Sequence, residues 1–409
     1  MKIVATIAKV ILVLLCVGLI VYGAFWYGRE EAPDFPIERL AESEAHGTPP
    51  RVEREFKFGM DISKARKSEK SSAGDSGTEA VSLAELPDQA FFMTDAGLAE
   101  LQEYVYRALQ NRIADPAWQA PGVLDNPYYI ARDPMTFVAR DVYADTQNND
   151  FERLAISYRL RHRFRSLNQM DNHEKRPTQG HHFPYRCEIQ SKTEREELGD
   201  GWSRVSEARF EFRVESAPFS PQNPPPPPPW HVKDYFPVMQ KGVWQDMVIL
   251  PGKELAAFLK EKKVEEPVTI VPRIMLVTSR MRMHLDIKSP YGSGPNPEQA
   301  FIISIDRSDV FDGEAYLDYL RANWYERSVR PPVQATFFEV EIEFERNVST
   351  VLDRLVAEKG TPELRRTLKA FHHDLQMIRD IAIEALEARG VQCDPRGRNK
   401  YLQSLLEIE

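Results

Sequence analysis

The chain has 409 residues, which is long enough to bury the core of one large domain or two. Its 53 Lys and Arg residues against 62 Asp and Glu residues give a formal net charge of −9, so we expect no nucleic-acid partner, and any other polyanion would need a local basic site. The three cysteines define no disulfide framework.

The N-terminus carries an apolar run. Residues 10–28 are uncharged, and the run is about long enough to cross a bilayer core of about 30 Å. A cleaved signal peptide is the alternative, but no A-x-A-like cleavage site follows the run. Lys2 and Lys9 precede it and acidic residues follow it, which favours a soluble domain on the extracytoplasmic side of a membrane. We therefore predict a single-pass membrane anchor over residues 1–28 and a polar tether over residues 29–50.

The first extended segment, RVEREFKF at residues 51–58, alternates in character. Glu53, Glu55 and Lys57 share one face of an extended chain, and the phenylalanines share the other. The simple interpretation of one such strand is a surface strand with its aromatic face in the core and its charges in water. The later strands decide between this interpretation and a strand whose charged face is enclosed.

Two polar or proline-rich segments interrupt the pattern, and we interpret residues 59–92 and 216–237 as insertions. The second contains six prolines at residues 224–229, which cannot join a sheet or a helix interior. The prolines form a stiff spacer, or they dock a proline-binding partner.

Helical periodicity with end signals occurs in four places. The longest stretch, residues 361–390, starts with Thr361 as N-cap and Pro362 at the first helical position, and it ends at Gly390. The other helices are expected at residues 94–112, 252–263 and 315–327. We predict that residues 347–409 form a C-terminal helical segment.

Between the helices, extended segments repeat the alternation of the first strand. The segment from residue 156 places four arginines on one face, and the segment from residue 335 places four glutamates on one face. These residues are Arg159, Arg161, Arg163 and Arg165, and Glu339, Glu341, Glu343 and Glu345. The outer members of these rows, Arg163, Arg165, Glu343 and Glu345, are expected at a rim or in solvent.

A solvated outer face explains any one of these strands, but it explains poorly why the charges are sorted by sign. Like charges this close repel each other unless opposite charges or a bound multivalent ion lie across from them. Eight predicted strands, one of them at residues 136–143, can provide that arrangement by closing on themselves around a charged interior. The predicted fold class is therefore α+β: an eight-stranded antiparallel closed β-barrel with flanking helices, plus the N-terminal transmembrane helix.

Eight short motifs follow one another along these strands. In chain order they are EREFK (53–57), VYADT (142–146), YRLRHRF (158–164), CEIQSK (187–192), RFEFR (209–213), SRMR (279–282), SID (304–306) and FEVEIEF (338–344). Their order resembles that of the triphosphate tunnel metalloenzymes, the superfamily of CYTH domains and of the VTC domains of polyphosphate polymerases. The resemblance implies one CYTH- or VTC-like tunnel domain over residues 51–346.

The resemblance also implies roles for the charged residues, which suit the chemistry of their side chains. Arginine and lysine donate to phosphate oxygens, and carboxylates are hard ligands for Mg²⁺ or Mn²⁺. The implied phosphate-binding residues are Lys57, Arg159, Arg161, Lys192, Arg209, Arg280 and Arg282. The implied metal ligands are Glu53, Glu55, Glu211, Asp306, Glu339 and Glu341. Catalytic roles fall on Glu53, Glu55, Lys57, Arg161 and Glu341.

Two positions depart from the VTC pattern: Gln190 stands where a lysine is common, and Ile302 stands where an arginine is common. The function implied is a membrane-anchored, metal-dependent phosphohydrolase acting on inorganic triphosphate, polyphosphate or a nucleoside triphosphate. A VTC-like polyphosphate polymerase and a non-catalytic polyphosphate-binding envelope module are the alternatives.

Overall fold

The computed structural model describes residues 48–67, 86–114, 129–130, 135–175, 184–199, 202–212, 250–264, 270–287, 298–321, 329–344, 362–394 and 400–408. Its strands are β1 (Thr48–Asp61), β2 (Tyr129–Ile130), β3 (Met135–Thr146), β4 (Ser157–Phe164), β5 (Arg186–Gly199), β6 (Trp202–Phe212), β7 (Ile270–Ile287), β8 (Glu298–Asp312), β9 (Ala335–Phe344) and β10 (Gln392–Asp394). Its helices are α5 (Asp88–Phe92), α6 (Asp95–Ala114), α7 (Asp150–Arg153), α8 (Leu167–Lys175), α10 (Leu250–Glu261), α11 (Gly313–Arg321), α13 (Pro362–Glu387) and α14 (Lys400–Ile408).

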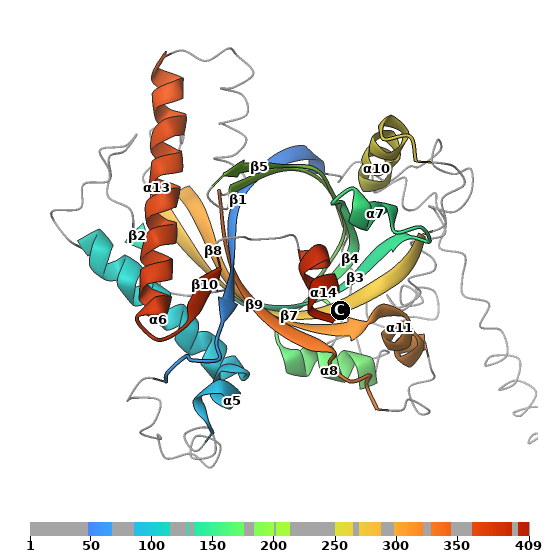
Figure 1. Ribbon diagram of the computed structural model, residues 1–409, viewed down its shortest axis with the longest axis horizontal. Coiled ribbons are helices and arrows are strands. Elements are labelled where there is room, and N and C mark those ends of the chain that lie inside the picture. Colours follow the sequence, from blue (N-terminus) through green and yellow to red (C-terminus); the bar gives the residue numbers. More distant parts are fainter. Residues whose placement is uncertain are drawn as a thin grey trace, which may run out of the picture.

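The described strands form one antiparallel sheet. Its hydrogen-bonded order is β10-β1-β6-β5-β4-β3-β7-β8-β9, and β2 pairs with β7. Strand β1 is paired on more than one side, because residues 51–56 pair with β6 while residues 55–60 pair with β9. The strands therefore curl around a common inner face (Figure 1).

Each strand divides its side chains between the two faces of this sheet. On β1, Phe56 and Phe58 are buried in an apolar cluster that also contains Leu101 of α6 and Leu375 of α13. The alternating neighbours of the phenylalanines, Glu55 and Lys57, point to the opposite face and are also buried. The aliphatic and aromatic faces thus lie outward under helices, and the charged faces lie inward.

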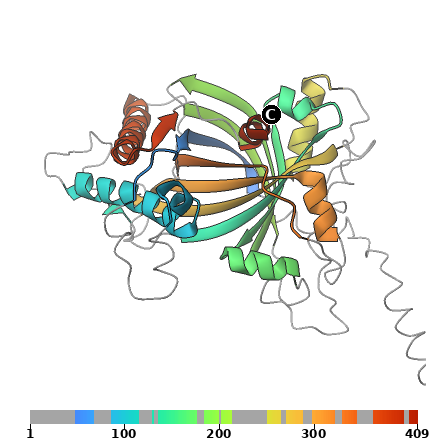
Figure 2. The same ribbon diagram turned by 60° about the horizontal axis from the view of Figure 1, so that its bottom comes forward.

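The helices cover the outer face in two groups. Helices α5, α6 and α13 pack over β1, β8 and β9, while α8, α10 and α11 pack on another part of the same outer face, over β3, β4, β5 and β7 (Figures 1 and 2). The end signals of the predicted helices are confirmed where the structure describes them. Thr94 Oγ1 accepts a hydrogen bond from Gly97 N at 3.1 Å at the start of α6, and α13 starts at Pro362. Helix α14 differs from the others because it lies within the curl of the strands and contacts β7 and β9 (Figure 1).

The predicted fold class was wrong as stated. An α+β fold with an antiparallel sheet is correct, but the sheet has ten strands, and its path ends in the short strand β10, which among the described residues pairs with β1 alone. The predicted eight-stranded barrel is therefore not what forms, because the sheet includes β2 and β10 as additional strands. The sequence pattern missed β2 and β10 because strands of two or three residues carry no alternation.

The prediction of a single-pass anchor and membrane localisation is also wrong as a description of this structure. Within the described part of the chain, no helix is long and apolar enough to cross a membrane. The apolar run of residues 1–28 and the six prolines of residues 224–229 lie outside the described residues.

Candidate functional site: a buried charged inner face

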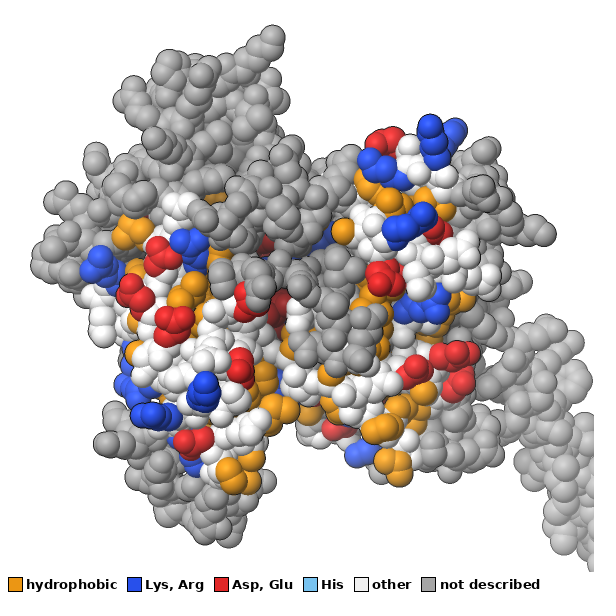
Figure 3. Space-filling model, viewed as in Figure 1, with side chains coloured by type: hydrophobic (Ala, Val, Ile, Leu, Met, Phe, Trp, Pro, Cys, Tyr) orange, Lys and Arg blue, Asp and Glu red, His pale blue; other side chains and the backbone are white. Residues whose placement is uncertain are grey.

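The inner face of the sheet buries the charge rows that the sequence predicted. Arg159, Arg161 and Arg163 of β4 and Glu341 and Glu343 of β9 are each exposed by 8% or less. Buried ionised groups are tolerated only when they are paired. In contrast, acidic and basic side chains are interspersed on the described outer surface in the view of Figure 3.

The register of the strands brings the acidic positions together at one part of this face. Asp306 of β8 lies opposite Glu339 of β9 and opposite Arg280 of β7, while Glu341 lies opposite Lys57 of β1. The carboxylates of Asp306, Glu339 and Glu341 place ligand oxygens within 4.8 Å of one another. We call these three residues the acidic cluster. All three were predicted metal ligands.

Two cations of the sheet, Arg280 and Lys57, form ion pairs with the acidic cluster. The Arg280 guanidinium donates to Asp306 at 2.7 and 2.6 Å and to Glu341 at 2.5 Å. Lys57 Nζ lies 3.6 Å from Glu341 and 3.0 Å from Glu55. Burial alone would raise the pKa of Glu341, but the charges of Lys57 and Arg280 outweigh it and hold that pKa well below its ordinary value.

A third cation comes from outside the sheet. Lys400, the first residue of α14, places Nζ 2.7 Å from Asp306 Oδ2 and 2.6 Å from Glu339 Oε1. Burial would lower the pKa of Lys400, but the two carboxylates reverse this and raise it. This contact could not be predicted from the sequence, since Lys400 follows β10 in a segment without a family motif.

The arginine-rich part of the inner face is arranged around Glu188 of β5, and we call it the arginine cluster. The Glu188 carboxylate lies 2.9 Å from Arg163, 2.6 Å from Arg186 and 3.8 Å from Arg209. Burial would raise the pKa of Glu188, but the charges of Arg209, Arg163 and Arg186 lower it to about 2. Burial lowers the pKa of Arg163 to about 9, an effect that Glu188 opposes and the neighbouring arginines add to. Three cations thus share one carboxylate here.

Ion pairs and hydrogen bonds across β3, β4 and β5 connect the acidic cluster with the arginine cluster. Asp141 of β3 accepts hydrogen bonds from Arg161 at 2.7 and 2.6 Å and from Arg159 at 3.3 Å. Burial would raise the pKa of Asp141, but the charges of Arg161 and Arg159 hold it below its ordinary value. Gln190, which departs from the expected lysine, accepts from Arg159 Nε at 2.7 Å and donates to Glu207 at 2.6 Å. A neutral amide therefore bridges a cation and an anion at this position.

The Y-x-D-T motif has a structural explanation. Asp145 accepts hydrogen bonds from the backbone N–H groups of Phe151 at 2.8 Å and Glu152 at 3.0 Å, so it stabilises the start of α7. Asp145 also contacts α14, since Tyr401 Oη donates to Asp145 Oδ2 at 2.7 Å. The Tyr401 ring stacks on Tyr143 with centroids 5.7 Å apart.

Most predicted site residues therefore meet on one face. Of the remaining ones, Lys192 Nζ lies 3.3 Å from Glu55, and Arg282 lies 3.8 Å from Glu343. The side chains of Glu53 and Glu211 lie outside the described ones. The expected rim positions are corrected in part: Arg165 is exposed, but Arg163 and Glu343 are buried because each has a paired strand on both sides. Glu345 lies outside the described residues. Sequence reasoning gave no site role to Asp141, Arg186, Glu188, Glu207 and Lys400.

Ile302, the other departure from the VTC pattern, lies opposite Glu343 in the register. It is almost fully buried, and it brings no cation to this position.

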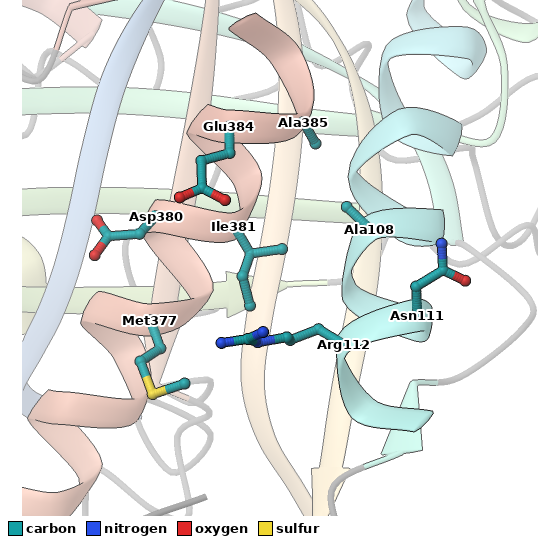
Figure 4. A pocket seen from close by; sticks show the side chains of 8 residues that line it. All are labelled: Ala108, Asn111, Arg112, Met377, Asp380, Ile381, Glu384 and Ala385. Atoms are coloured by element: carbon teal, nitrogen blue, oxygen red, sulfur yellow. The ribbon is translucent and has the colours of Figure 1, made fainter. Parts of the chain in front are cut away.

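A separate groove of about 820 Å³ lies between α6 and α13. It is lined by Arg112 and Asn111 on one helix and by Met377, Asp380 and Glu384 on the other (Figure 4). Because these helices cover the outer face of the sheet, this groove is distinct from the charged inner face.

Comparison with known proteins gives the following. No family model and no curated protein matches the chain. Solved structures do match: HpAC1 from Hippeastrum, a putative adenylyl cyclase described as having a dominant triphosphatase activity, is 12% identical, with 86% of this chain and 95% of that chain covered and a TM-score of 0.31. The Pct1 RNA triphosphatase of S. pombe is 12% identical, with coverage of 86% and 90% and a TM-score of 0.30.

The structural neighbours of this chain named here are triphosphatases and adenylyl cyclase-like proteins. A putative adenylate cyclase from Bacillus halodurans is another, at 12% identity, coverage of 68% and 84%, and a TM-score of 0.26. With TM-scores near 0.3, the likenesses carry no argument about the chemistry of this chain, which depends on the inner face itself.

Proposed function

We propose that this protein is a metal-dependent phosphohydrolase that binds a triphosphate group along its inner face. One observation supports this proposal above the others: buried arginines and lysines and a buried group of three carboxylates lie on the same face of one sheet. A triphosphate with a bound divalent ion carries both kinds of charge, so it is complementary to both parts of the face.

The donor chemistry of the acidic cluster fits the proposed ion. Asp306, Glu339 and Glu341 offer hard oxygen ligands, which suit Mg²⁺ or Mn²⁺. When bound, such an ion would neutralise developing charge on the phosphate and polarise the phosphorus–oxygen bonds.

The side chains of the chain do the remaining work of binding and positioning. Arg280 contacts Asp306 and Glu341, so it lies where phosphate oxygens and metal ligands would meet. Arg159 and Arg161 are held in fixed orientations by Asp141, and a planar guanidinium held in this way binds phosphate oxygens in a bidentate manner. Inorganic triphosphate, polyphosphate and nucleoside triphosphates share this charge pattern, and all three are candidate substrates.

The test is phosphate release from inorganic triphosphate with Mg²⁺ or Mn²⁺. We expect Glu341→Gln and Arg161→Ala each to lower kcat/KM by about a hundredfold or more, because each removes a charge proposed to stabilise the transition state. Arg107→Ala is the matched control, since Arg107 is an exposed arginine paired with Glu103 on α6. Equal activity in the wild type and the two inner-face variants would refute the proposal.

Binding without turnover is the second candidate function. Its support is Gln190, which provides a neutral amide where the VTC pattern has a cation, and Lys400, which pairs with two members of the acidic cluster. Triphosphate binding by calorimetry together with no phosphate release, with either metal, would favour it over hydrolysis.

A further inference from the structure

Lys400 lies where a metal ion would be expected. Its ammonium group contacts Asp306 and Glu339, two of the three members of the acidic cluster, at 2.7 and 2.6 Å, and it is exposed by only 4%. It also approaches Ser308 Oγ at 3.4 Å. A buried ammonium at these distances provides the positive charge that a bound ion would otherwise supply.

The position of Lys400 is fixed by its helix. The next residue, Tyr401, is almost fully buried, stacks on Tyr143 and donates to Asp145. On the following turn, Leu405 packs against the same apolar cluster as Tyr401. These contacts connect α14 to β3, so Lys400 is a built part of the inner face and not a free surface lysine.

The local charges explain why Lys400 and a divalent ion compete. Around the acidic cluster, the three carboxylates face three cations, namely Lys57, Arg280 and Lys400. A divalent ion needs oxygen ligands at about 2.0–2.1 Å for Mg²⁺, which requires the same carboxylate oxygens that Lys400 contacts. It would also lie within a few ångströms of the ammonium charge, and two cations so close repel strongly when both are buried.

We infer that Lys400 is an internal counter-ion that competes with a divalent cation for Asp306 and Glu339, so that the acidic cluster binds metal tightly only when α14 withdraws. The inference depends on the proposed function only in naming the class of ion. It makes the C-terminal helix an autoinhibitory element, because the helix carries its own substitute for the ion.

The first test is Mn²⁺ binding to the full chain, without any phosphate compound, by electron paramagnetic resonance. We expect Lys400→Met to lower the Kd for Mn²⁺ by about tenfold or more, because it leaves the cluster with one unbalanced negative charge. Lys400→Arg keeps the charge and is expected to leave the Kd near that of the wild type. Lys262→Met, at an exposed ion pair after α10, is the matched control.

A fourth variant shows where the ion binds. Adding Glu339→Gln to Lys400→Met is expected to remove the gain in affinity, since it removes a ligand of the cluster. Equal Kd values for the wild type and Lys400→Met would overturn the inference, and so would a gain that survives Glu339→Gln.

The second test needs no variant. Saturating Mn²⁺ is expected to speed amide hydrogen exchange across residues 400–408 of the wild type, because the ion displaces Lys400 from the carboxylates. Unchanged exchange at saturation would overturn the inference. Neither test measures hydrolysis, so a protein without phosphatase activity can still pass both, and the two proposals fail separately.

Discussion

At the scale of single residues, Glu188 shows how much the inner face depends on compensation. The buried carboxylate of Glu188 forms ion pairs with Arg163, Arg186 and Arg209, and the charges of these arginines lower its pKa to about 2. Removing it would leave the buried Arg163 and the partly buried Arg186 and Arg209 without their shared partner. Breaking a buried ion pair from one side typically costs about 3–5 kcal/mol.

The stability contributed by Glu188 should depend on pH in a defined window. A carboxylate with a depressed folded pKa contributes fully above its ordinary value of 4.5 and loses the contribution as pH falls to about 2. We expect Glu188→Gln to lower the free energy of unfolding by about 3 kcal/mol at pH 7, and the difference from the wild type to shrink steadily from pH 4.5 to pH 2. Urea denaturation at several pH values measures this.

The control for this prediction is Glu103→Gln, which removes an exposed carboxylate paired with Arg107 and should change stability little at any pH. A stability difference for Glu188→Gln that stays constant between pH 4.5 and pH 2 would contradict the pKa assignment.

At the scale of elements, the connection from α13 to β10 is sterically demanding. Gly390 follows α13 with a φ of 83°, a conformation that side chains rarely adopt. A Cβ added there would lie 2.3 Å from the backbone oxygen of Lys64. The turn therefore allows the end of α13 and the region after β1 to approach closely, as the backbone hydrogen bond from Arg66 N to Arg389 O at 2.8 Å also shows.

We expect Gly390→Ala to lower the free energy of unfolding by more than about 1 kcal/mol, since it adds both a backbone penalty and a clash with backbone atoms that cannot rotate away. Thermal unfolding measures this, with Gly59→Ala on β1 as the control because a Cβ at Gly59 meets no atom within 4 Å. Two variants of equal stability would show that the turn relaxes freely.

At the scale of the whole molecule, the sequence was sufficient to predict features that repeat along a strand. It was insufficient to predict contacts that occur only once. The rows of β4 and β9 were predictable because alternation places Arg159 and Arg161, and Glu339 and Glu341, on single faces. The burial of Arg163 was missed because no pattern in one strand says where its neighbours end. Lys400 was missed because its contact depends on how α14 packs, which is a tertiary property without a local signal.

The charge arrangement of the whole inner face predicts a preference for extended polyanions. We expect inorganic triphosphate to raise the Tm of the wild type without added metal, because its charges can replace Glu188 and Glu207 as counter-ions of the arginines. Orthophosphate at matched ionic strength is the control and should raise the Tm much less. Equal shifts from the two anions would mean that the effect is one of ionic strength alone.

The pairing of β1 with β9 has a consequence for biosynthesis. Lys57, near the start of the chain, finds its partner Glu341 only after almost the whole sheet has been translated. A nascent chain emerging from the ribosome must therefore keep the buried lysine and glutamate of β1 hydrated until the last long strand arrives. Pairings between such distant segments are slow to form, so we expect this protein to complete its fold after release from the ribosome and not during synthesis.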